Sequence, residues 1–184
     1  MSFPVWKTLI LGKDAKNAAD FERLIKGKGM RIGDYAIDIF SKPEFKVADR
    51  EQEVDLVRVS VEQMGFAKEE VTRQEIYRRA IKLGLELCPC EVGPALRLSY
   101  EDQPDKEWLF IGMETIADSQ KDMVIFRVGN GDGNLWLRCY CSNTGNTWRP
   151  HSVTLRSSSG IASASFLLTN GFRSSSPRAE ALAI

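Results

Sequence analysis

The chain has 184 residues, enough for one domain with a sizeable hydrophobic core. Hydrophobic residues make up 43% and charged residues 27%, which is the composition of a soluble globular protein. Lysine plus arginine equals aspartate plus glutamate, 25 against 25, so the charge gives no reason to expect a nucleic acid or an anionic membrane as partner.

The first residues, Met1 to Lys7, lack the basic and then apolar pattern of a secretory signal. No apolar run in the sequence approaches the length needed to cross a bilayer. We therefore expect a cytoplasmic chain without membrane insertion, and surface display by another route stays open.

The first elements in chain order are a strand and two helices. Alternating side chains predict a strand over Trp6 to Leu11. Asp14 or Asn17 is expected to cap a helix that ends at Gly27 and Gly29. Its apolar residues recur at helical spacing: Ala18, Phe21, Leu24 and Ile25. A second, shorter helix is predicted over Gly33 to Phe40, before Pro43.

The next elements are a strand over Val54 to Val61 and a third helix. Thr72 followed three residues later by Glu75 is a capping box, which marks the start of that helix. The apolar pattern continues to Leu83, and Gly84 is expected to end the helix.

The second half of the chain is predicted to be rich in strands. Short apolar runs between turn residues cover Leu85–Cys88, Ala95–Tyr100, Trp108–Glu114, Met123–Val128 and Leu135–Tyr140. The run Gly129 to Asn134 is glycine-rich but precedes a strand, so we expect a hairpin turn and no phosphate loop. This order favours an α+β fold with N-terminal strand and helices, then short antiparallel strands and loops.

Four cysteines form two close pairs, Cys88 with Cys90 and Cys139 with Cys141. Neither pair has the two-residue spacer of a zinc knuckle, so no metal site is predicted. A single zinc ion bound by all four cysteines is an alternative. The chain has one histidine, His151, in a polar run. A small Cys/His enzyme is a further alternative, but no third orienting group is indicated. We therefore predict no catalytic residues and no cofactor.

The tripeptide Gln103-Pro104-Asp105 matches one that holds calcium and sugar in animal C-type lectins. Those lectins add a Trp-Asn-Asp in the next strand, whereas this chain has Leu135-Trp136-Leu137. A calcium ion would lack ligands, so sugar binding by this route is not expected.

The composition changes sharply at Arg138. Lys, Glu, Gln and Met occur throughout the chain before this residue, and none of them occurs between Arg138 and Ala179. Apart from Trp148, every residue type in this stretch can be encoded by a codon ending in C. Randomising the two adenines of asparagine codons ending in C would produce this alphabet.

With Trp136-Leu137, Asn143-Thr144-Gly145-Asn146 and Trp148-Arg149-Pro150, the stretch resembles the variable region of proteins diversified by diversity-generating retroelements. The resemblance implies a C-type lectin-like fold with Trp136, Trp148 and Pro150 as scaffold. It also implies a set of variable, ligand-binding residues: Arg138, Cys139, Tyr140, Cys141, Ser142, Thr144, Asn146, Thr147, Arg149, His151, Ser152 and Thr154. Tyr140, Arg138, Arg149 and His151 are of the types that make good contact residues.

The upstream part is similar to a set of uncharacterised bacterial proteins over Trp6–Thr8, Glu53–Val57, Leu83–Pro94 and Trp108–Ser119. Those proteins end soon after a Trp/Phe-Val-Phe strand, which Val153-Thr154-Leu155 and a serine-rich extension replace here. We expect a single domain over 1–170, with its variable region at about 136–156, and a flexible tail over 171–184. In a C-type lectin-like fold the first strand would lie beside a C-terminal strand such as Phe166–Thr169. The expected partner is a protein or a surface glycan, and the oligomeric state is open.

Overall fold

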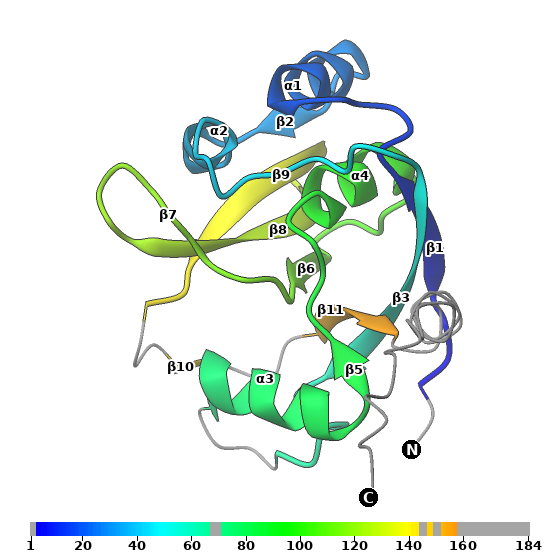
Figure 1. Ribbon diagram of the computed structural model, residues 1–184, viewed down its shortest axis with the longest axis vertical. Coiled ribbons are helices and arrows are strands. Elements are labelled where there is room, and N and C mark those ends of the chain that lie inside the picture. Colours follow the sequence, from blue (N-terminus) through cyan, green and yellow to red (C-terminus); the bar gives the residue numbers. More distant parts are fainter. Residues whose placement is uncertain (1–2, 67–70, 144–146, 149–151, 158–184) are drawn as a thin grey trace, which may run out of the picture.

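The computed structural model describes residues 3–66, 71–143, 147–148 and 152–157. These residues form a mixed α+β fold in which helices cover a curled sheet (Figure 1). The helices are α1 (Ala18–Gly27), α2 (Asp34–Phe40), α3 (Arg73–Lys82) and α4 (Val92–Ser99). The strands are β1 (Lys7–Leu11), β2 (Arg31–Ile32), β3 (Gln52–Ser60), β4 (Val71–Thr72), β5 (Leu85–Glu86), β6 (Trp108–Ile111), β7 (Ile116–Ala117), β8 (Met123–Gly131), β9 (Asn134–Cys141), β10 (Thr147–Trp148) and β11 (Ser152–Ser157).

The N-terminal elements follow the hydrophobic pattern of the sequence. In β1, Leu9 and Leu11 are buried while Ile10 between them is 43% exposed, as alternation predicts. Of the two expected capping residues it is Asn17 that caps α1, because its side chain accepts a hydrogen bond from the backbone N–H of Asp20. The expected strand and the two expected helices between Trp6 and Phe40 are confirmed, and β2 (Arg31–Ile32) is a further strand that was not predicted.

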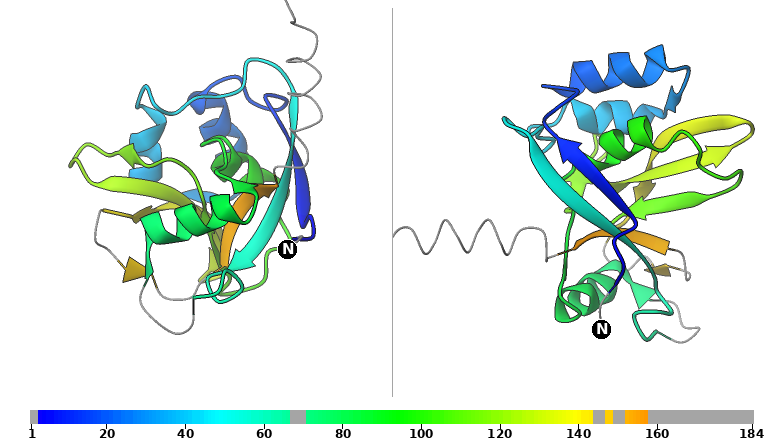
Figure 2. Two further views of the ribbon diagram at one scale, coloured as in Figure 1. Left: turned by 60° about the horizontal axis from the view of Figure 1, so that its bottom comes forward. Right: turned by 90° about the vertical axis from the view of Figure 1, so that its right-hand side faces the viewer.

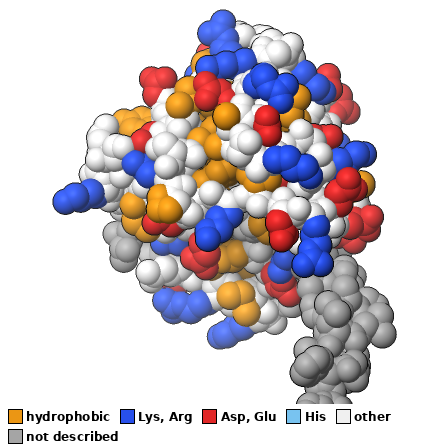
Figure 3. All heavy atoms as spheres, turned by 45° about the horizontal axis from the view of Figure 1, so that its top comes forward, with side chains coloured by type: hydrophobic (Ala, Val, Ile, Leu, Met, Phe, Trp, Pro, Cys, Tyr) orange, Lys and Arg blue, Asp and Glu red, His pale blue; other side chains and the backbone are white. Residues whose placement is uncertain are grey.

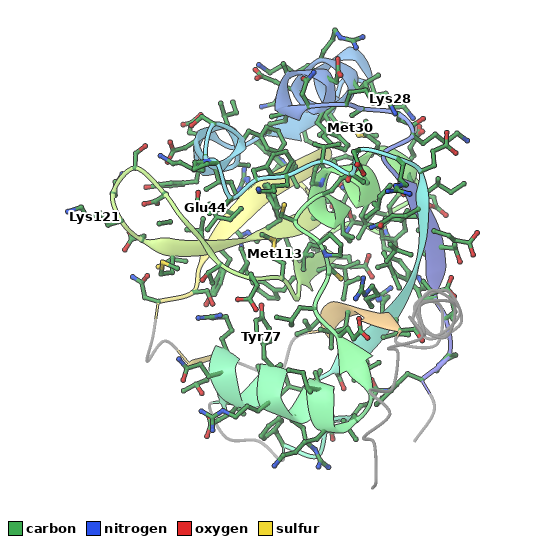
Figure 4. The ribbon with its side chains drawn as sticks, in the orientation of Figure 1. Lys28, Met30, Glu44, Tyr77, Met113 and Lys121 are labelled. Carbon is green, nitrogen blue, oxygen red and sulfur yellow. The ribbon has the colours of Figure 1, made fainter. Side chains whose placement is uncertain are left out.

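The capping box at the start of α3 is confirmed in both directions. The Thr72 hydroxyl accepts a hydrogen bond from the backbone N–H of Glu75, and the Glu75 carboxylate accepts one from the backbone N–H of Thr72. Farther along the same helix, the Tyr77 side chain points from α3 toward Met113 (Figure 4), and its hydroxyl donates to the backbone carbonyl oxygen of Met113 at 2.9 Å. This bond ties α3 to the segment after β6, and burial raises the pKa of Tyr77.

Replacing Thr72 with alanine is expected to lower the free energy of unfolding by about 1 kcal/mol, because the first turn of α3 loses its side-chain cap. Equilibrium urea denaturation measures this change. Gln74→Ala, an exposed change in the same turn, is the matched control and should leave the free energy of unfolding nearly unchanged. Equal losses in the two variants would contradict the capping account.

One predicted strand is wrong: Ala95–Tyr100 belongs to helix α4 and to the residue that follows it. A short apolar run bounded by turn residues does not distinguish a buried strand from a buried helix. Here Val92 and Leu96, four residues apart, are both fully buried on one helical face. Pro94 is tolerated because it lies in the first turn, where its missing N–H has no partner to lose.

The main sheet has the strand order β1-β3-β11-β6-β8-β9-β2, with β5 beside β11 and β7 beside β8. Most pairs are antiparallel, as predicted. Two are parallel, β11 with β6 and β2 with β9, which corrects the expectation of a wholly antiparallel sheet. In both cases the two strands are far apart in sequence, so the intervening chain is long enough for a crossover.

The hairpin predicted between β8 and β9 is confirmed. Gly131 pairs with Asn134, which leaves Asp132 and Gly133 as a two-residue turn. Both turn residues have positive φ, 54° and 69°, the conformation that a type I′ turn requires. The hairpin therefore fixes the register in which β9 presents its side chains.

One hydrophobic core, built of residues from Leu9 to Leu155, joins the helices to the sheet. Helices α1 and α2 lie together at one end of the molecule and α3 lies at the other (Figure 2). The partner of β1 is β3, and the proposed partner strand Phe166–Thr169 lies outside the described residues. The expected boundary between the domain and its tail, at residue 170, also lies outside them.

Candidate functional site

Strand β9 carries the first part of the predicted variable stretch and divides its side chains between two faces. Leu137 is fully buried in the core. Trp136, Arg138 and Tyr140 occupy the alternate positions and point to the opposite face of the sheet. There the ring of Tyr140 meets that of Phe110 in β6 edge to face, with 4.9 Å between their centroids.

Arginine and tryptophan side chains alternate on this face. The guanidinium of Arg138 lies 3.8 Å from the ring centroid of Trp136 and 5.5 Å from that of Trp108. Arg31 lies 5.4 Å from the Trp136 ring, and Arg127 lies 4.5 Å from the Trp108 ring. We call this set the arginine–tryptophan ladder: Arg31, Trp136, Arg138, Trp108 and Arg127. Cation–π attraction stabilises each contact by about 0.5–2 kcal/mol, depending on its exposure.

A glycine makes room for the ladder. Trp108 of β6 lies opposite Gly129 of β8, and its indole ring rests on the glycine backbone. A Cβ atom at position 129 would lie 2.1 Å from the Cε3 atom of that ring, far inside van der Waals contact. The position of Trp108 therefore depends on the absence of a side chain at Gly129.

Beside the ladder lies an open pocket of about 490 Å³, between the start of α2 and β9. The pocket is lined by residues of β2, α2, β8 and β9 and the turn that joins β2 to α2: Ile32, Gly33, Asp34, Tyr35, Arg127, Trp136, Arg138 and Cys139. Three of them belong to the predicted site, namely Trp136, Arg138 and Cys139. Tyr35 is 51% exposed at the rim.

The charge of this region is uneven. None of Arg31, Arg127 and Arg138 forms an ion pair with another residue in the described part of the chain. Burial lowers the pKa of Arg127, and the neighbouring positive charge of Arg138 lowers it further. Elsewhere acids and bases are interspersed, as on the face that Figure 3 displays. The ladder thus concentrates positive charge in an otherwise balanced protein.

Two residues of the predicted variable set are buried. Ser142 and Thr154 are both 0% exposed, and neither hydroxyl has a hydrogen-bond partner among the described residues. The site that the sequence predicted is therefore smaller in this region than the residue alphabet indicated. Asn143 is fixed as well: its side chain accepts from the backbone N–H of Met123 and donates to Asp122.

Several predicted site residues lie outside the described residues or are described by backbone alone. Thr144, Asn146, Arg149, Pro150 and His151 lie outside. For Thr147, Trp148 and Ser152 the structure describes only strand pairing, with Thr72, Val71 and Ser60 respectively. Among the predicted residues whose side chains are described, the open face therefore holds Arg138 and Tyr140, with Cys141 exposed at the strand end.

The four cysteines do not gather. Within the described part of the chain, no three His, Cys, Asp or Glu side chains are grouped so that they could hold a metal ion. The Cys88 thiol donates to the carbonyl of Thr154, while the Cys90 sulfur accepts from the backbone N–H of Lys46. The zinc alternative therefore has no support from these side chains. His151, which the Cys/His alternative requires, lies outside the described residues.

The thiols are expected to differ strongly in reactivity. Burial raises the pKa of Cys88 to about 12 and raises that of Cys139 as well, whereas Cys141 is exposed. In the native protein Cys141 should react with iodoacetamide at least about a hundredfold faster than Cys88 or Cys139, because the thiolate is the reacting form.

Peptide mass spectrometry of a labelling time course measures these rates, and the same course in urea is the control in which they should converge. A native Cys139 that labels as fast as Cys141 would contradict the raised pKa of this half-buried thiol and favour the Cys/His alternative.

The Gln103-Pro104-Asp105 tripeptide has a structural role at its first residue. Gln103 is buried and its side-chain oxygen accepts a hydrogen bond from Arg97 at 2.6 Å. Its side-chain nitrogen donates to the carbonyl of Val128 in β8. The glutamine thus joins α4 to the sheet, which leaves its side chain unavailable for an ion.

The sequence analysis did not predict three of the five residues of the arginine–tryptophan ladder. Arg31, Trp108 and Arg127 come from three different elements, and none stands in the compositionally distinct stretch. Two features of the sequence could have identified these residues. Trp108 stands at the start of a predicted strand, and the register of the predicted β8–β9 hairpin determines which residues of the two strands face each other. Arg127 lies directly opposite Arg138 in that register.

None of the helices in the described ranges is long and apolar enough to span a membrane. No protein-family model, curated protein or solved structure matches this chain.

Proposed function

We propose that the chain is a non-enzymatic ligand-binding domain whose binding surface is diversified by a retroelement. The observation that carries this proposal is the residue alphabet that begins at Arg138, inside strand β9. Diversification is useful only where changed side chains can meet a ligand without disturbing the fold. Arg138 and Tyr140 are half-buried and Cys141 is exposed on β9, after a fixed hairpin and beside the core residue Leu137, and these positions satisfy that requirement.

We further propose that the architecture is C-type lectin-like, and that the ligand is a protein or a surface glycan and not a nucleic acid. Support for the architecture comes from its element order: a strand and two helices precede a set of short strands. Tyr140 and Arg138 suit a protein or glycan ligand, since aromatic and guanidinium side chains commonly anchor interfaces. Trp136 supports them as a scaffold residue by stacking on Arg138.

Sequencing this gene in many independent isolates tests the proposal. Codons 138, 140 and 141 should carry many different residues, including large ones, while codon 137 stays apolar because Leu137 fills the core. Codons 142 and 154 should vary only among small residues, since their side chains are fully buried.

The hairpin codons 130–135 serve as the internal control and should be nearly constant. Substitutions spread evenly over β8 and β9 would contradict diversification.

A further inference from the structure

We infer that the pocket beside β9 binds a ligand through an anionic oxygen group, a carboxylate or a phosphate. This inference rests on the proposed function, because it names the chemistry of the ligand at the same face. It adds a place for that ligand, between the start of α2 and the arginine–tryptophan ladder.

Contact with an indole ring leaves the edge of a guanidinium group open. A guanidinium that lies over an indole ring uses its face for that contact, so its N–H donors still point outward in the plane. The guanidinium of Arg138 lies 3.8 Å from the ring centroid of Trp136, and that of Arg127 lies 4.5 Å from the ring centroid of Trp108. The ladder therefore restricts the motion of two guanidinium groups without occupying their donors, which reduces the entropy that a ligand must overcome.

The terminal nitrogens of Arg127 and Arg138 are available as hydrogen-bond donors. No described residue accepts a hydrogen bond from the terminal nitrogens of Arg127 or Arg138, and, unlike the buried Nε of Arg127, these nitrogens are not among the buried side-chain atoms that lack a partner. Both arginines line the pocket. A carboxylate or phosphate can accept two parallel hydrogen bonds from one guanidinium, which makes such groups the natural complement of this pocket.

The residues that line the pocket carry a net positive charge. Asp34 is the acid among the lining residues, and it is exposed on the first turn of α2. Arg127 and Arg138 exceed it by one positive charge, and Arg31 on the far side of Trp136 adds another. An anion that enters the pocket therefore relieves repulsion between neighbouring cations, whereas a neutral ligand does not.

The inference is tested by titrating the full chain with sodium pyrophosphate and, separately, with tricarballylate, at a constant ionic strength of about 0.15 M. Isothermal titration calorimetry and indole fluorescence follow binding, since Trp108 and Trp136 adjoin the pocket. Saturable binding of either probe is expected. Binding of pyrophosphate alone assigns the pocket to phosphate-bearing ligands, and binding of tricarballylate alone assigns it to carboxylates.

Two variants and one control make the result specific. Arg138→Gln should weaken binding at least about tenfold, because it removes one bidentate donor. Asp34→Asn should tighten binding about threefold by removing the opposing acid, a gain that misfolding does not produce. Arg78→Gln removes an equal charge from an exposed position on α3 and should leave binding unchanged.

Absence of saturable binding in the unaltered chain, or equal weakening by Arg78→Gln, would overturn the inference. Failure here and failure of the proposed function are distinguishable. Variable codons without anion binding would support diversification and contradict the anion site. Anion binding with constant codons would support the anion site and contradict diversification.

Discussion

Replacing Arg97 with leucine is expected to lower the free energy of unfolding by about 3–5 kcal/mol, the largest effect of any single change proposed for this protein. Arg97 is fully buried on α4. Its guanidinium donates to the side-chain oxygen of Gln103 at 2.6 Å, to the carbonyl of Gly129 at 3.1 Å and to the carbonyl of Tyr100. Leucine would remove the hydrogen bonds to all three acceptors.

The expected cost comes from the orphaned acceptors more than from the lost charge. Burial lowers the pKa of Arg97 to about 10, which shows that the charged guanidinium is held at a desolvation cost. A second change, Gln103→Leu, removes one of the acceptors that lose their donor. The loss in the free energy of unfolding of the double variant should therefore be smaller than the sum of the losses in the two single variants.

Urea denaturation of the single and double variants measures these differences. Arg78→Ala, at an exposed position on α3, is the matched control for removal of an arginine and should change the free energy of unfolding by less than about 0.5 kcal/mol. A loss below about 1 kcal/mol in Arg97→Leu would contradict the assigned hydrogen bonds.

Gly129→Ala is expected to destabilise the fold by about 2–3 kcal/mol and to displace Trp108. The added methyl group would overlap the indole ring, with 2.1 Å to Cε3 and 2.3 Å to Cδ2. The ring must move, and the cation–π contacts that Arg127 and Arg138 make with it are then lost. Anion binding should weaken together with stability, although no residue of the pocket has been changed.

Thermal denaturation and near-ultraviolet circular dichroism measure the two effects, since the latter reports the packing of tryptophan rings. Gly27→Ala is the matched control, because a Cβ atom at the end of α1 meets nothing within 4 Å. Alanine is also the better helix former, so this control should be as stable as the unaltered chain or slightly more stable. Equal destabilisation of both variants would contradict the close approach of Trp108 to Gly129.

Local signals in the sequence predicted local structure well. The Thr72 and Glu75 pair fixes where α3 begins, and the two residues Asp132 and Gly133 fix the hairpin, because in each case the residues that interact are neighbours in the chain. The strand predicted over Ala95–Tyr100 was wrong because the conformation of this segment depends on the elements that pack against it. Arg97 finds its acceptors in the loop after α4 and in β8, which no local pattern reveals.

The candidate site was predictable only along β9. Its place on the chain followed from composition, and its alternation followed from the strand period. The burial of Ser142 and Thr154 depends on packing between distant segments. The residue types alone therefore predicted both as variable site residues, in the same way as Arg138. The contributions of Arg31 and Trp108 required the sheet order, which places β2 and β6 on opposite sides of the β8–β9 hairpin.

The central claim is that a retroelement diversifies the stretch from Arg138 to Thr154. Sequencing the DNA around this gene in a complete genome tests it most directly. We expect a reverse transcriptase gene and a near-copy of the coding stretch close by, with mismatches confined to adenines of the copy. A complete genome that holds neither the near-copy nor the reverse transcriptase would contradict the claim.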